Sequence, residues 1–126
     1  MRSLMLVAFL VGATGAIAGE PHLELELPRA RVATAPAGYW ARVHITPRDN
    51  DRLLVVEVDG APGEYRRSDY ALEGARGWRV KTVWFTSLPT GCYTFMATIF
   101  DDDRRQTAHA RGGPLRVISI DGDPCA

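Results

Sequence analysis

The chain has 126 residues, of which 46% are hydrophobic, enough for one domain with a packed core and unlike the composition of a disordered chain. Its 15 Lys and Arg side chains balance its 15 Asp and Glu side chains, so the formal net charge at pH 7 is zero. A balanced chain has no overall field to attract nucleic acid or an anionic membrane surface. We therefore expect neither class of partner for the mature chain.

Residues 1–18 have the pattern of a signal peptide. Arg2 supplies a positive charge, residues 4–11 form an apolar run, and Ala16 and Ala18 supply the small-x-small pattern before a cleavage site at Gly19. The alternative is an uncleaved membrane anchor, but the apolar run is short for a membrane span. We predict a signal peptide over 1–18, a mature domain over 19–126, and a secreted or periplasmic location without membrane attachment after cleavage.

The mature chain shows no sustained helical period, and Gly and Pro interrupt it about every ten residues. Short apolar or alternating stretches between these interruptions predict about seven strands and an all-β fold. The expected strands are 23–27, 39–46, 53–59, 68–72, 78–86, 92–100 and 115–120. The turns between them include 47–51, 60–63 and 112–114.

The alternation within these stretches predicts which side chains face the core. Leucines point inward and glutamates outward in 23–27. Tyr39 begins an inward set in the second strand, which leaves Trp40 outside. In 78–86 the same reasoning places Phe85 inside and Trp84 outside.

The stretch 88–101 carries the strongest pattern in the chain. It opens with a turn containing Pro89 and Gly91 and continues as a long period-2 strand that ends at Asp101. The turn with its tyrosine, L-P-x-G-x-Y, resembles the tyrosine corner of β-sandwich domains. The residues that carry it are Leu88, Pro89, Gly91 and Tyr93, followed by Phe95, Ala97, Ile99 and Asp101.

On these residues the chain resembles a bacterial immunoglobulin-like or fibronectin type III-like module from residue 23 to residue 120. The resemblance implies an immunoglobulin-like Greek-key β-sandwich, in which the hydroxyl of Tyr93 bonds back to the backbone of its turn. The glycine typical of these families after the aspartate is absent, because Asp102 stands there. The resemblance therefore indicates an architecture and no functional subfamily.

The resemblance also implies a pairing for the two cysteines, Cys92 and Cys125. In such a sandwich the last strand runs antiparallel beside the strand that Cys92 begins, so its C-terminal end lies near that cysteine. Export would expose both thiols to an oxidising compartment. We expect an intramolecular disulfide, with free or intermolecular thiols as the alternative.

No motif for catalysis or cofactor binding is present. His22, His44 and His109 have no ligand-spaced partner, and we interpret them as solvated surface side chains. The sequence contains no nucleophile elbow, H-E-x-x-H motif or glycine-rich phosphate loop. We predict no cofactor, no catalytic residues and no enzymatic activity.

Two acidic turns are expected at one end of the sandwich, and their oxygens are possible calcium ligands. The aspartates are Asp49, Asp51, Asp101, Asp102 and Asp103. The alternative is surface ion pairing with the arginines interleaved among them, which are Arg48, Arg52, Arg104 and Arg105.

Two apolar groups are expected on the outer faces of the two sheets. One is the pair Trp40 and Trp84; the other is the set Leu53, Val55, Met96 and Phe100. Each group is a possible contact surface, and the alternative is local cross-strand packing, including stacking of Arg42 on a tryptophan.

These features favour an exported, non-enzymatic interaction or adhesion module that contacts a protein partner through an outer sheet face. The alternative is a small carbohydrate-binding module that stacks sugars on Trp40 and Trp84. The sequence identifies neither the protein partner nor the glycan.

Overall fold

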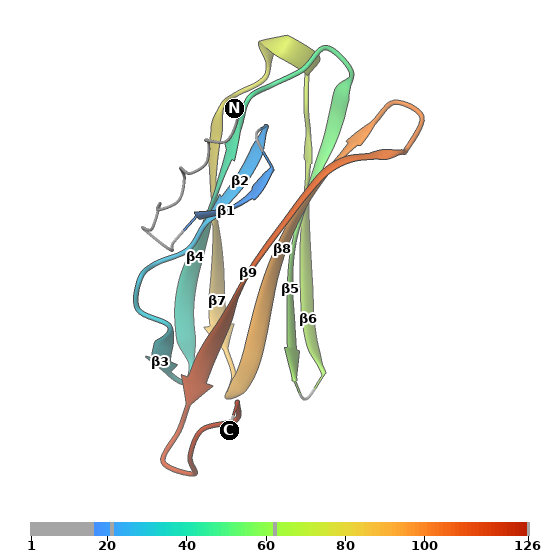
Figure 1. Ribbon diagram of the computed structural model, residues 1–126. Coiled ribbons are helices and arrows are strands. Elements are labelled where there is room, and N and C mark those ends of the chain that lie inside the picture. Colours follow the sequence, from blue (N-terminus) through green and yellow to red (C-terminus); the bar gives the residue numbers. More distant parts are fainter. Residues whose placement is uncertain (1–16, 21, 62, 126) are drawn as a thin grey trace, which may run out of the picture.

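Two β-sheets pack face to face in the structure, a computed structural model that describes residues 17–20, 22–61 and 63–125 (Figure 1). The predicted signal peptide lies outside the described residues apart from Ile17 and Ala18, which begin the first strand. No helix in the described part of the chain is long and apolar enough to cross a membrane.

The smaller sheet has four strands in the order β1-β2-β4-β7. They are β1 (Ile17–Glu20), β2 (Leu23–Glu26), β4 (Ala37–Ile45) and β7 (Val80–Leu88). All neighbours in this sheet are antiparallel. Because β4 leads to the other sheet and β7 returns from it, the chain crosses between sheets as a Greek-key sandwich does.

The larger sheet has five strands in the order β3-β9-β8-β5-β6. They are β3 (Val32–Thr34), β9 (Gln106–Ile118), β8 (Gly91–Asp101), β5 (Asp51–Ala61) and β6 (Glu64–Ala71). The short β3 pairs parallel with β9, and the other neighbours are antiparallel. A short 3₁₀ turn, η2 (Gly74–Arg76), precedes β7.

The all-β sandwich predicted from the sequence is confirmed, but the strand list needs four corrections. The described residues form nine strands, because β1 and β3 are short pieces without a clear alternation. The third correction is β6, which begins at Glu64 and not at the expected residue 68. The fourth is β9, which runs straight through 112–114, where a break was expected. A register shift there pairs Phe95 with Gly112 and Tyr93 with Leu115, so a bulge absorbs the glycines and the proline without ending the strand.

The core lies between the two sheets and is built from the inward half of each strand. Leu23 and Leu25 on β2 and Tyr39, Ala41 and Val43 on β4 are buried, as their alternation predicts. On the facing sheet the inward residues of β8 are fully buried; they are Tyr93, Phe95, Ala97 and Ile99. Phe95 joins the sheets, since its ring centroid lies 5.4 Å from that of Tyr39 and 5.7 Å from that of Phe85.

The hydroxyl of Tyr93 donates a hydrogen bond to the carbonyl oxygen of Pro89 at 2.6 Å, the bond that the tyrosine-corner resemblance implies. Gly60 lies directly across the strand pair, and a Cβ atom there would come within 2.3 Å of the Tyr93 ring. A glycine is therefore needed for the ring to lie against β5. Burial raises the pKa of Tyr93, and the nearby Glu64 carboxylate raises it further.

Cys92 and Cys125 form the expected disulfide, with their Cα atoms 5.1 Å apart. The C-terminal segment turns back after β9, so that Cys125 meets the start of β8 (Figure 1). Arg116 on β9 forms an ion pair with Asp123 in this segment, at 3.2 Å. The bridge and the ion pair hold the returning segment against the end of the larger sheet.

We predict that Tyr93→Phe lowers the free energy of unfolding at pH 7 by about 1 kcal/mol, because the Pro89 carbonyl loses its donor. Folding raises the pKa of Tyr93, so its hydroxyl contributes fully to the free energy of unfolding at pH values below the pKa that it has in the unfolded chain. That contribution is lost as the pH rises from there through the pKa of the folded state. The wild-type chain should therefore lose stability above about pH 10 more steeply than the variant. Urea unfolding at pH 7, 9 and 11 measures the difference. A constant difference across this range contradicts the prediction.

We predict that replacing both cysteines by serine lowers the free energy of unfolding by about 3–4 kcal/mol, because the bridge closes a loop of 33 residues that the unfolded chain otherwise leaves open. Urea unfolding of the variant and of oxidised wild type measures the loss. Wild type in the presence of a reductant should unfold like the variant, and a loss below about 1 kcal/mol would contradict a stabilising role for the disulfide.

Candidate functional site

The outer face of the four-stranded sheet carries the tryptophan pair. Trp40 on β4 and Trp84 on β7 lie directly opposite each other in the strand register. Trp84 is 63% exposed, whereas Trp40 is partly buried. The guanidinium carbon of Arg42 lies 4.6 Å from the centre of the Trp40 ring, so the stacking considered above as an alternative covers one of the two rings.

A polar network fixes the residues beside this pair. Glu26 on β2 accepts a hydrogen bond from His44 at 2.8 Å and lies 3.7 Å from the guanidinium of Arg42. Arg42 also donates to the hydroxyl of Thr82 at 3.2 Å. Strands β2, β4 and β7 are thereby tied together on their solvent side.

Beyond Thr82 on β7 lies Val80, which is 50% exposed. It extends the apolar part of this surface along the strand. We call the outward residues Trp40, Arg42, Val80, Thr82 and Trp84 the tryptophan face.

The outer face of the five-stranded sheet is more closed than the sequence predicted. Val55, expected to be a contact residue, points away from the core but is only 2% exposed. Leu53, Met96 and Phe100 on the same face are partly buried. Val55 lies between the polar residues Asp69 of β6 and Thr98 of β8, its register partners. The sequence alternation gives a side chain's direction and does not show how far its neighbours bury it.

The polar side chains of this face are paired with one another. Arg67 donates two hydrogen bonds to Asp69, at 2.6 and 3.1 Å, and this interaction holds the pKa of the Asp69 carboxyl below its ordinary value. The hydroxyl of Tyr65 donates to Glu57 at 2.5 Å. On the other side of Val55, Thr98 and His109 are hydrogen-bonded at 2.9 Å.

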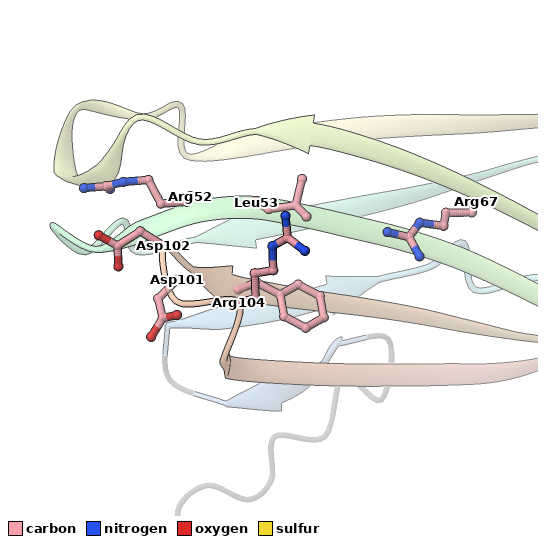
Figure 2. A pocket seen from close by; sticks show the side chains of 7 residues that line it. Arg52, Leu53, Arg67, Asp101, Asp102 and Arg104 are labelled. Atoms are coloured by element: carbon pink, nitrogen blue, oxygen red, sulfur yellow. The ribbon is translucent and has the colours of Figure 1, made fainter.

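A hollow of about 640 Å³ remains at one end of this face (Figure 2). Leu53 and Phe100, which pair across β5 and β8, supply its apolar part. Its charged lining comes from Arg52, Arg67, Asp101, Asp102 and Arg104. The sequence indicated these two apolar residues and the acidic turn separately; only the register of β5 and β8 brings them into one site.

The two acidic turns do lie at one end, since Asp51 and Asp101 are register partners. Their aspartates have different roles, however. The carboxylate oxygens of Asp101, Asp102 and Asp103 lie within 4.8 Å of one another, the one such group of three metal-ligating side chains in the described chain. Asp101 also closes its own turn by accepting from the backbone N–H groups of Asp103 and Arg105, both at 2.9 Å.

Asp51 is not available to this cluster, because it is 1% exposed and turned toward His22. One carboxylate oxygen accepts from the backbone N–H of Arg48 at 2.9 Å, and the other lies 3.7 Å from Nε2 of His22. His22 is 3% exposed, so its interpretation as a solvated surface histidine is wrong. Leu23 beside it is fully buried, and the carbonyl oxygen of His22 accepts from the backbone N–H of Thr46 at 3.0 Å, which holds this residue next to the end of β4.

Comparisons with known proteins show similarity of fold alone. No protein-family model matches the chain, and no curated protein matches it in sequence. Among solved structures, superoxide reductase (neelaredoxin) from Ignicoccus hospitalis aligns with a TM-score of 0.57 at 16% identity, over 80% of this chain and 83% of that one. A single-residue variant of that enzyme aligns with a TM-score of 0.54 at 15% identity, over 75% and 79%. A CARDB domain from Pyrococcus furiosus, in complex with di-metal ions, aligns at 0.46 and 18% identity, over 82% and 90%.

The prediction that the chain has no enzymatic activity is contradicted by this comparison. Superoxide reductases are enzymes, and they share the two-sheet fold of this chain. A small all-β sandwich without a catalytic motif therefore gives no ground for excluding catalysis. Fold similarity at 16% identity transfers no activity either, because unrelated sites are carried by one fold.

The chain's own residues do not gather into a redox centre within the described ranges. Histidine and cysteine are the side chains that most often hold redox-active metals. Here the two cysteines are bonded to each other, and His22, His44 and His109 interact with Asp51, Glu26 and Thr98, on separate parts of the fold. The comparison therefore supports the architecture and assigns no site residue.

We predict that Asp51→Ala lowers the free energy of unfolding by about 2–4 kcal/mol, because the Arg48 N–H loses its acceptor and His22 loses its buried partner. Asp49→Ala is the matched control in the same loop: Asp49 is exposed, and its backbone carbonyl keeps the bond from Arg52. The control should change stability by less than about 0.5 kcal/mol. Equal effects of the two substitutions in urea unfolding contradict a structural role for the buried pair.

Proposed function

We propose that the chain is an exported interaction module that contacts a protein partner through the tryptophan face. The observation that supports this most directly is the exposure of Trp84, 63%, directly opposite Trp40 in the strand register. Indole rings at the centre of an interface contribute more binding free energy than other side chains, since each buries a large apolar area together with an N–H donor.

The surroundings of the pair favour a protein over other partners. Val80 extends the apolar surface along β7, and Arg42 and Thr82 between the two apolar positions offer hydrogen-bonding groups. Protein interfaces are enriched in aromatic residues and arginine and carry hydrogen-bonding groups among their apolar contacts.

The edge of this sheet is partly covered. β7 is the edge strand of its sheet in the described chain. Arg66 from β6 donates to the carbonyl oxygens of Thr86 and Ser87, which covers the end of that edge beyond Trp84. We therefore place the contact on the face of the sheet and not on its edge.

A carbohydrate-binding module is the second candidate. A sugar ring stacks on the face of an exposed indole, and the uncovered ring of Trp84 offers such a face. Glu26 and Arg42 lie close enough to the pair to bond sugar hydroxyls. Val80 separates the two candidates, because an exposed valine adds buried apolar area to a protein interface and offers no surface for sugar stacking.

The test compares Trp84→Ala and Val80→Ser with the wild-type mature chain. The partner recovered on immobilised wild-type chain is purified and titrated against each variant by calorimetry. For a protein partner we expect Trp84→Ala to weaken binding at least about 30-fold and Val80→Ser about fivefold. A glycan array tests the second candidate, which predicts binding that Trp84→Ala abolishes and Val80→Ser leaves unchanged.

Val32→Ser is the matched control, because Val32 is a similarly exposed valine on β3 of the other sheet. It should leave either kind of binding unchanged. All three substitutions are at surface positions, and melting temperatures verify that the variants are folded. A partner whose affinity is insensitive to Trp84→Ala overturns the proposed face.

A further inference from the structure

The hollow at the end of the five-stranded sheet combines an apolar floor with an arginine that has no partner within the described chain. Leu53 and Phe100 form the floor, and their chain neighbours Leu54 and Ile99 are fully buried on the opposite side of the sheet. The position of the floor residues is thus fixed by the core beneath them. Both floor side chains are partly exposed. Figure 2 shows Leu53 beside Arg104.

The charged side chains around this floor differ in whether they already have a hydrogen-bond or ion-pair partner within the protein. Arg52 donates to the carbonyl oxygens of Asp49 and Asp51, at 2.7 and 2.9 Å, and so holds the β4–β5 loop. Arg67 is committed to Asp69 by two hydrogen bonds. Asp101 accepts from the N–H groups of its own turn.

Asp102 and Arg104 are the exceptions, since neither side chain takes part in any of the hydrogen bonds or ion pairs within the described ranges, although both line the hollow. In Figure 2 the carboxylate of Asp102 lies away from Leu53, so only Arg104 lies over the apolar floor. Its backbone has a φ of 63°, a conformation that non-glycine residues seldom adopt, and its N–H bonds to the carbonyl of Asp101 at 3.1 Å. In Figure 2 the side chain extends from the β8–β9 turn toward Leu53. The turn therefore directs an unpaired guanidinium over an apolar floor.

A planar guanidinium binds a carboxylate through two parallel hydrogen bonds, which gives both charge and geometric complementarity. An apolar group attached beside that carboxylate would cover Leu53 and Phe100. The hollow lies on the outer face of a sheet, so it buries one side of its occupant. That suits a side chain presented by a protein more than a free small molecule, whose pocket encloses most of its surface.

We propose that this hollow is a docking site for a peptide segment of a partner protein in which a carboxylate neighbours a large apolar side chain. The carboxylate pairs with Arg104, and the apolar side chain packs on Leu53 and Phe100. The site is on the opposite sheet from the tryptophan face and does not depend on it.

The test titrates the ¹⁵N-labelled mature chain with N-acetyl-Phe-Glu-amide and with its neutral analogue N-acetyl-Phe-Gln-amide. We expect the acidic peptide to bind with a dissociation constant on the order of millimolar and to shift the resonances of Leu53, Phe100 and the Arg104 Nε–H group. The neutral analogue should bind about tenfold more weakly, since it offers no charge to the guanidinium. Added salt should weaken the acidic peptide more than the neutral one.

Arg104→Gln should weaken the acidic peptide about tenfold and leave the neutral one unchanged. Arg105→Gln is the matched control, because Arg105 is an exposed arginine of the same turn that is not among the residues lining the hollow. Leu53→Ser should weaken both peptides. Equal binding of the two peptides, equal effects of the two arginine substitutions, or no shift at about 10 mM peptide overturns the proposal. Tighter binding of free 3-phenylpropanoate than of the acidic peptide would also overturn it, in favour of a small-molecule site.

Discussion

The packing of the inward side of β8 is the interaction on which the rest of the structure depends. β8 lies between β5 and β9 in the larger sheet, and Phe95 contacts aromatic rings of the smaller one. Tyr93 is held at the start of the strand by its bond to Pro89 and by its fit against Gly60. Because a slip of one residue would turn every inward side chain outward, these contacts fix the register of the whole larger sheet.

That register decides what the outer surface of the same sheet can do. It places Phe100 opposite Leu53 and brings the turn with Arg104 over both. It also places Val55 among shielding polar side chains, which removes it from the surface. The packing of β8 in the core therefore determines which outward side chains are exposed to solvent. The candidate binding hollow is a consequence of the same packing that stabilises the fold.

The two sheets differ in how far the side chains on their outer faces are paired with one another. The larger sheet covers most of its face with paired side chains such as Arg67 with Asp69. On the smaller sheet the network of Glu26, Arg42 and Thr82 ties the strands together but leaves Trp84 uncovered. An exposed indole next to a satisfied polar network is a surface without an internal partner, and this is why we place the protein contact there. The shared fold of superoxide reductases shows that such a sandwich also accommodates catalysis.

The sequence alone determined the all-β class, the inward and outward sides of most strands, the tyrosine corner and the cysteine pair. The class and the strand sides follow from one periodic pattern, whereas the tyrosine corner and the cysteine pair came from the resemblance to immunoglobulin-like modules. It did not determine the passage of β9 through Gly112 and Pro114, the burial of His22 with Asp51, or the cover over Val55. Each of these depends on residues distant in the sequence, and burial in particular is set by neighbours across the sheet. Only the tertiary structure identified Arg104 as an unpaired charge beside an apolar floor, because whether a side chain is paired depends on all the side chains that lie near it in space.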